Sequence, residues 1–197
     1  MGSVGTPGSL AVGVPAIALA MRTASTAPDS GAPFSGIGAV TQAPFGENAL
    51  DAKTASTLHA LNDQDFGKGV LGAQLIAEAR ALPRMINGKR LYLIPTETGK
   101  LCAFLEGGTE ACTEPLSEAR PAAVIAMDDD GPGGVGAVVF GVAIDGVRTV
   151  SFTAAGARHV VPVKGNMFAF QGSPMMTAEG LSGQTATFDD GTTVRLS

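Results

Sequence analysis

The sequence predicts a mainly β protein, with one or two short N-terminal helices and a body that is β-sandwich-like or an open barrel. Its 27 glycines and 12 prolines favour many turns and short strands over long helices. Turn residues recur roughly every ten residues in the C-terminal part, which is the spacing of a sandwich or barrel. Hydrophobic residues make up 45% of the chain, so a packed core can form.

Residues 1–46 are predicted to form a signal-like segment followed by a flexible linker. The apolar run 10–21 contains an Ala-Leu-Ala pattern that signal peptidases accept, and it is too short to span a bilayer, which needs roughly 20 residues. Because no Lys or Arg precedes it, a plain flexible tail is the alternative. Residues 22–46 are rich in Ala, Ser, Thr, Pro and Gly, which disfavours a packed structure. Three apolar residues of this stretch, Phe34, Ile37 and Phe45, are candidates for packing against the β domain.

Residues 47–83 are predicted to form a helical segment that covers one face of a sheet. The stretch 48–61 has few helix breakers and an apolar stripe. The stretch 70–82 repeats apolar residues at helical spacing. These residues are Leu71, Leu75, Ala79 and Leu82. Pro83 is expected to end this second helix, because its ring and missing N–H cannot continue the hydrogen-bond ladder.

Residues 84–197 are predicted to form the β domain. The continuous apolar runs 122–127 and 135–144 indicate buried strands. The alternation within 149–153 places Val150 and Phe152 on one face of a strand. The remaining predicted strands are 91–94, 101–105, 159–163, 167–170, 185–188 and 192–196.

Cys102 and Cys112 are the only two cysteines, and their spacing predicts a disulfide between neighbouring strands. If a five-residue loop is centred on Gly107, the two residues face each other across a hairpin, with Cα atoms about 4.5–5.5 Å apart. Closing a ring of this length stabilises the fold by roughly 2.5–3 kcal/mol. Because such bonds persist in oxidising compartments, the pair predicts an extracytoplasmic location, secreted or envelope-associated. Two unpaired, buried thiols in a cytosolic protein are the alternative.

The sequence indicates no metal site and no cofactor. The two cysteines and the distant histidines His59 and His159 do not form a spaced zinc-ligand set, and neither histidine lies near a G-x-S-x-G or C-x-x-C motif. Residues 131–136 match G-x-G-x-x-G, but a β-type apolar run follows them instead of a helix. The carboxylates just before this motif would also repel a phosphate. We therefore expect both histidines to be structural.

The acidic run Asp128, Asp129 and Asp130 is the candidate binding loop. It lacks the spacing of a calcium-binding loop, because Ala126 stands where an aspartate is needed. We therefore interpret it as a solvated turn. Since rigid sheets present variable loops for recognition, residues 128–136 are expected to contact a partner.

Charge and composition disfavour two classes of partner, nucleic acids and anionic membrane surfaces. The net charge is −5 and the isoelectric point is about 4.9, and basic residues occur at most as adjacent pairs. Nucleic-acid binding needs several phosphates neutralised together, and strong membrane-surface binding needs a similar basic cluster. The absence of Trp and the single Tyr leave few rings on which bases could stack.

Four short patterns follow one another along the chain. They are a hairpin with Ile94, Pro95, Gly99 and Cys102, then Cys112, then residues 141–150 around Asp145-Gly146-Val147, and finally residues 161–168. In this ordered set, residues 71–197 resemble a group of small exported proteins from high-GC Gram-positive bacteria. The resemblance implies export, often behind an N-terminal membrane or signal segment, and a mostly β domain. It implies no activity and no site residues, and the first residues of this chain depart from the pattern because they lack a basic start.

These observations predict a non-catalytic module of the cell envelope or exterior that binds a protein or an envelope polymer. One alternative is a small hydrolase, which would show two Asp or Glu side chains facing each other in a pocket with raised pKa values. A structural spacer is a second alternative, and it would show neither a pocket nor an exposed apolar patch.

Overall fold

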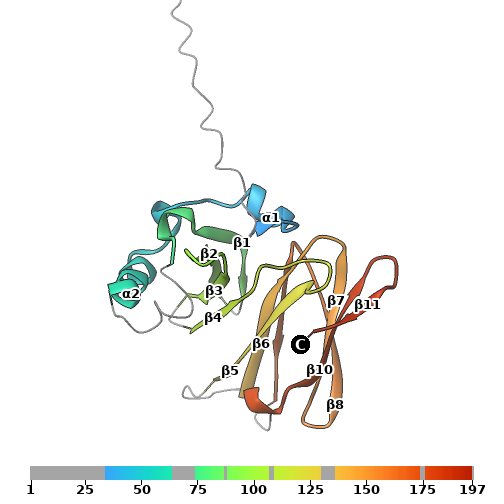
Figure 1. Ribbon diagram of the computed structural model, residues 1–197. Helices are drawn as coiled ribbons and strands as arrows, with labels where there is room; N and C mark the ends of the chain where they lie inside the picture. Colours follow the sequence, from blue (N-terminus) through green and yellow to red (C-terminus); the bar gives the residue numbers. More distant parts are fainter. Residues whose placement is uncertain are drawn as a thin grey trace, which may run out of the picture.

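The computed structural model describes residues 34–63, 74–86, 88–106, 109–129, 136–173 and 176–196 (Figure 1). Strands dominate these residues and form three antiparallel sheets that stay open and do not close into a barrel. The predicted mainly β, sandwich-like fold class is therefore confirmed.

The first sheet has the strand order β1-β2-β3-β4. Its strands are β1 (Arg80–Ile86), β2 (Lys89–Pro95), β3 (Leu101–Leu105) and β4 (Thr109–Thr113). The alternation of side chains along β2 and β3 gives this sheet two apolar faces. Leu91 and Leu93 point to one face, whereas Tyr92 and Ile94 point to the other.

The other two sheets have the strand orders β5-β6-β9 and β11-β10-β7-β8. Their strands are β5 (Ala122–Asp129), β6 (Gly136–Ala143), β7 (Val147–Ala154), β8 (Ala157–Pro162), β9 (Met167–Gln171), β10 (Ser182–Phe188) and β11 (Thr193–Arg195). In Figure 1 these sheets lie beside the first one and make up the C-terminal part of the molecule. The predicted strands match β2, β3 and β5 to β11 with end differences of up to three residues.

The middle strand β6 explains why the sequence signal there was clear. Residues 137–143 are all buried, so both faces of β6 are covered. A strand covered on both faces is read in sequence as a continuous apolar run, as predicted. Strand β7 alternates instead, with Val150 and Phe152 fully buried, and this prediction is also confirmed.

The described residues include two α-helices, α1 (Gly38–Thr41) and α2 (Ala52–Asp63), and the three short 3-10 helices η2 (Glu47–Ala49), η3 (Ile76–Glu78) and η4 (Ala178–Gly180). None of the helices in the described ranges has both the length and the apolar character needed to cross a bilayer. Helix α2 corresponds to the first predicted helix. Asp51 Oδ1 caps α2 by accepting hydrogen bonds from the backbone N–H groups of Lys53 (3.1 Å) and Thr54 (3.0 Å).

Two apolar cores lie on the two faces of the first sheet. The smaller core lies between the sheet, α2 and η3, and consists of Leu50, Leu58, Ile76, Ala79, Ala81, Tyr92, Ile94 and Phe104. The larger core joins the opposite face of the sheet to the other two sheets, with Phe140 and Phe152 among its fully buried side chains. The Tyr92 hydroxyl donates to Asp51 Oδ2 at 3.1 Å, which ties the start of α2 to the sheet.

The second predicted helix, residues 70–82, is wrong where the structure describes it. Residues 70–73 lie outside the described residues, residues 76–78 form η3, and β1 begins at Arg80. Residues 79–82 are all buried. A run of consecutive buried residues is compatible with a strand covered on both faces as well as with a helix. Pro83 lies where the pairing register with β2 shifts, in an edge strand that tolerates a missing N–H donor.

The predicted linker is also wrong for its described part, residues 34–46. Phe34, Ile37 and Val40 are each at most 4% exposed and belong to the larger core. The guanidinium of Arg80 lies over the rings of Phe34 (5.4 Å) and Phe45 (4.8 Å), a cation–π arrangement that holds the segment against β1. The apolar residues of this stretch, although sparse, therefore pack into the body. The signal-like run 10–21 lies outside the described residues.

Candidate functional site

The disulfide between Cys102 and Cys112 joins directly opposed residues of β3 and β4. Their Cα atoms are 3.9 Å apart, closer than the predicted spacing. The register also pairs Leu105 with Thr109, so the hairpin is symmetric about position 107, as predicted. Its two strands extend closer to the turn than the predicted five-residue loop would allow. A disulfide of this kind indicates an oxidising, extracytoplasmic environment.

Glu110 is a half-buried carboxyl group beside the disulfide. Alternation along β4 places it on the same face as Cys112, and its Oε1 lies 3.2 Å from the Cys112 Sγ. The Gln74 amide donates to the same oxygen. Burial raises the pKa of the Glu110 carboxyl above its ordinary value of 4.5. The oxygen and the two sulfurs lie within 4.8 Å of one another, but the sulfurs are bonded to each other and are not free thiolate ligands.

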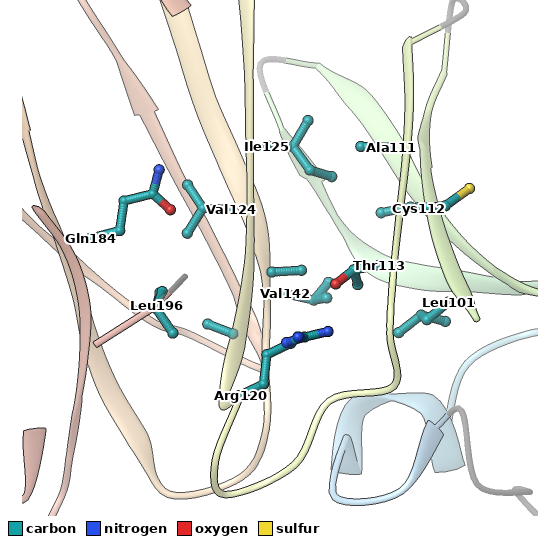
Figure 2. Close-up of a pocket in the computed structure, with 13 residues that line it drawn as sticks. Leu101, Ala111, Cys112, Thr113, Arg120, Val124, Ile125, Val142, Gln184 and Leu196 are labelled. Carbon is teal, nitrogen blue, oxygen red and sulfur yellow. The ribbon is translucent and has the colours of Figure 1, made fainter. Parts of the chain in front are cut away.

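A cavity of about 180 Å³ lies on the other side of β4, where the edge strand β4 faces the edge strand β5. Its walls come from all three sheets, and most of the residues that line it have apolar side chains. The apolar side chains that are largely buried are Leu101, Ala103, Ala122, Ile125, Val142 and Leu196. Figure 2 shows the Cys112 sulfur pointing away from this space, so the disulfide and the cavity occupy opposite faces of β4.

Three polar side chains interrupt the apolar lining: Thr113, Arg120 and Gln184. Arg120 is half-buried and precedes β5, and its guanidinium extends into the cavity toward Thr113 and Val142 (Figure 2). Its backbone is held by a turn in which the Arg120 N–H donates to the carbonyl oxygen of Ser117 at 3.0 Å. The cavity therefore combines an apolar wall with one fixed positive charge.

The predicted binding loop is only partly described, and its described acidic residues belong to a strand. Asp128 and Asp129 belong to β5, where they pair with Ala137 and Gly136 of β6. Asp128 Oδ1 accepts a hydrogen bond from the Ala178 N–H at 2.8 Å and so holds the start of η4. Asp128 is exposed, as the solvated-turn interpretation expects, but the turn itself is wrong for these two residues, because the hairpin ladder extends farther than the apolar run. Asp130 and residues 131–135 lie outside the described residues.

The histidines lie in unrelated surroundings. His59 on α2 is exposed, and its Nε2 lies 3.0 Å from the Glu47 Oε1. The His159 ring on β8 packs against Phe170 (4.5 Å between ring centroids) and Phe152 (5.5 Å). Both contacts agree with the structural role expected of each histidine, and neither residue lines the cavity.

Sequence reasoning missed Glu110 and Arg120. The spacing of two residues between Glu110 and Cys112 could have placed the carboxyl beside the disulfide, because alternate residues of a strand share a face. Arg120 carries no comparable signal. It is one basic residue between Ala119 and Pro121, and its importance depends on an encounter of β4 with β5 that no local pattern predicts.

Comparison with known proteins gives no further guide: no protein family, curated protein or solved structure matches this chain.

Proposed function

We propose that this chain is a non-catalytic binding module of the cell envelope or exterior, and that it holds part of its partner in the cavity between β4 and β5. The observation that carries the proposal is the cavity itself. Its largely buried apolar wall and its few polar side chains are the usual composition of a ligand site. A protein or an envelope polymer is the expected partner, and it would insert a small group here.

The location outside the cytoplasm is supported by the disulfide, which closes a short ring between neighbouring strands. Export is the natural route to the compartment in which such a bond persists.

The hydrolase alternative has less support. It needs two carboxyl groups that face each other across a pocket, and the described residues that line this cavity include neither Asp nor Glu. Glu110, whose pKa is raised by burial, lies on the opposite face of β4, beside Cys112.

The location is tested by fractionating the cells that make the protein and adding an alkylating reagent before lysis. We expect the chain in the extracytoplasmic fraction, with both cysteines resistant to alkylation until a reductant is added. A cytoplasmic chain whose thiols react at once would refute this part of the proposal.

The site is tested with 1-hexanol, a neutral apolar probe, followed by methyl chemical shifts of the purified protein. We expect shifts at Val142 and Leu196 in the wild type. The Ala111→Phe variant fills the cavity from β4 and should abolish them, whereas Ala157→Phe adds the same ring at an exposed position of β8 and should not. Circular dichroism checks that both variants fold. Equal responses of the two variants would show that the probe binds elsewhere.

A further inference from the structure

The guanidinium of Arg120 has no acidic partner among the described residues. Arginine stays protonated at all physiological pH values, so this half-buried side chain brings a permanent positive charge into an apolar space. Glu114, which follows β4, accepts from Lys100 instead, with 3.3 Å between Oε1 and Nζ. A charge that is partly removed from water favours an anion beside it.

Two neutral polar groups line the same cavity. The Thr113 hydroxyl and the Gln184 side-chain amide have no hydrogen-bond partner among the described residues, and both can donate. Thr113 lies beside the guanidinium in Figure 2, whereas Gln184 comes from the opposite wall with Leu196. A planar carboxylate matches the forked donors of a guanidinium and can accept from a neighbouring hydroxyl as well.

The rest of the cavity wall determines the chemistry of the uncharged part of the ligand. Ala111 and Val124 are half-buried and Leu196 keeps 9% of its surface exposed, and a purely polar ion would leave this apolar surface without contacts. The cavity volume of about 180 Å³ is smaller than the roughly 300–1,000 Å³ of sites for drug-sized molecules. These features fit a small ligand group with an apolar part and a negative charge at one end.

We infer that the cavity binds a carboxylate carrying a short apolar group, with the carboxylate on Arg120 and the apolar group against Val124 and Leu196. This inference rests on the proposed function and names the chemistry of the group that the partner inserts. A free short-chain carboxylate and the C-terminal residue of a peptide share this chemistry.

The test compares hexanoate, 1-hexanol and hexylamine as probes for the wild-type chain at pH 7, with dissociation constants taken from methyl shift titrations. We expect hexanoate to bind about tenfold or more tightly than 1-hexanol, because hydrogen bonds to charged groups are the strong ones. Hexylamine should bind most weakly. Added salt should reduce the preference for hexanoate by screening the charge.

Three arginine variants make the test specific. Arg120→Gln should bring the constants for hexanoate and 1-hexanol to within about twofold, while leaving 1-hexanol binding unchanged. Arg120→Lys should keep part of the preference, since the charge remains but the fork is lost. Arg148→Gln removes an exposed arginine from β7 and should change nothing.

N-acetyl-leucine distinguishes the two sources of the carboxylate. If it binds more tightly than hexanoate, and with the same dependence on Arg120, the group is a peptide C-terminus; if hexanoate is the tighter ligand, it is a free carboxylate. Equal binding of hexanoate and 1-hexanol in the wild type would overturn the inferred ligand class but leave the cavity as a binding site. Absence of shifts at the cavity with every probe would overturn the site and, with it, the binding part of the proposed function.

Discussion

Gly141 is the residue of the sheets with the least room for a side chain. It lies in β6 opposite Val124 of β5 and Phe168 of β9. A Cβ atom at this position would lie 1.9 Å from the Ala123 carbonyl oxygen and 2.6 Å from Phe168 Cζ. Because the closer atom belongs to the backbone of a paired strand, no rotamer change relieves the clash.

We therefore predict that Gly141→Ala destabilises the fold by about 3 kcal/mol, the upper end of the usual cost of overpacking. Urea denaturation of the two proteins measures this change. Gly180→Ala is the matched control, because its nearest neighbour would be Thr177 Oγ1 at an ordinary 3.5 Å. Equal effects of the two substitutions would contradict the close approach of β5 to β6.

Glu110 makes the stability of the protein depend on pH. Burial raises the pKa of this carboxyl in the folded state above its ordinary value of 4.5. The neutral form is thus favoured in the folded protein, and its stabilising contribution is present below pH 4.5 and lost as the pH rises through the raised pKa.

Glu110→Gln should remove this dependence, so the variant gains stability relative to the wild type at pH 8 but not at pH 4. Urea midpoints at the two values measure the difference. Glu118→Gln alters an exposed carboxyl and serves as the control. A wild type and a Glu110→Gln variant with parallel pH profiles would show that the carboxyl is not desolvated.

At the scale of elements, the two turns after β6 and β8 hold the N-terminal segment in place. The Asn166 Oδ1 accepts from the Ala39 N–H at 2.8 Å, and its Nδ2 donates to the Ala143 carbonyl oxygen (3.0 Å) and to Asp145 Oδ1 (2.9 Å). Asp145 Oδ1 also accepts from the Gly38 N–H at 3.0 Å. These bonds connect α1 to two turns that are more than one hundred residues away along the sequence.

Asn166→Gly should loosen α1 without straining the backbone. Asn166 has φ of 61°, which glycine adopts freely, so the substitution removes the side-chain hydrogen bonds alone. We expect a loss of about 1–3 kcal/mol and faster amide hydrogen exchange at residues 38–41. Ala155→Gly, at φ of 48°, controls for the backbone effect and should stabilise or be neutral. Unchanged exchange at α1 would mean that the apolar contacts of Phe34 and Ile37 suffice.

The strands and helices also show which parts of the fold local sequence patterns can predict. Most strands and the cysteine hairpin could be predicted from the sequence, because alternation, continuous apolar runs and turn residues are local signals. The strand β1 could not, since the consecutive buried residues Ala81 and Leu82 fit a strand covered on both faces as well as a helix, and only pairing with β2 decides between them. Docking of residues 34–46 depends on Asp145 and Asn166, and the candidate cavity depends on β4 meeting β5. Neither long-range contact leaves a local signal.

For the whole molecule, the first sheet couples the two cores. Leu91 and Leu93 of β2 belong to the larger core, and Tyr92 and Ile94 belong to the smaller one. Strand β2 therefore cannot detach from one core without also leaving the other. Unfolding should therefore be a single cooperative transition.

Tyr92 provides the measurement, because the chain has one tyrosine and no tryptophan and this residue is 2% exposed in the smaller core. Tyrosine fluorescence reports the smaller core, and far-UV circular dichroism reports all three sheets. We expect the two urea transitions to coincide within error. A fluorescence change at lower urea would show that α2 and its core unfold separately.

The position of the sulfur bond has a consequence for how the protein is made. Its two half-cystines are 10 residues apart and are the only cysteines of the sequence, so oxidation within the chain can form only the native pairing. The bond can close before β5 and the strands after it have appeared. The disulfide can thus form before either core is complete, and no disulfide isomerase is required to correct it.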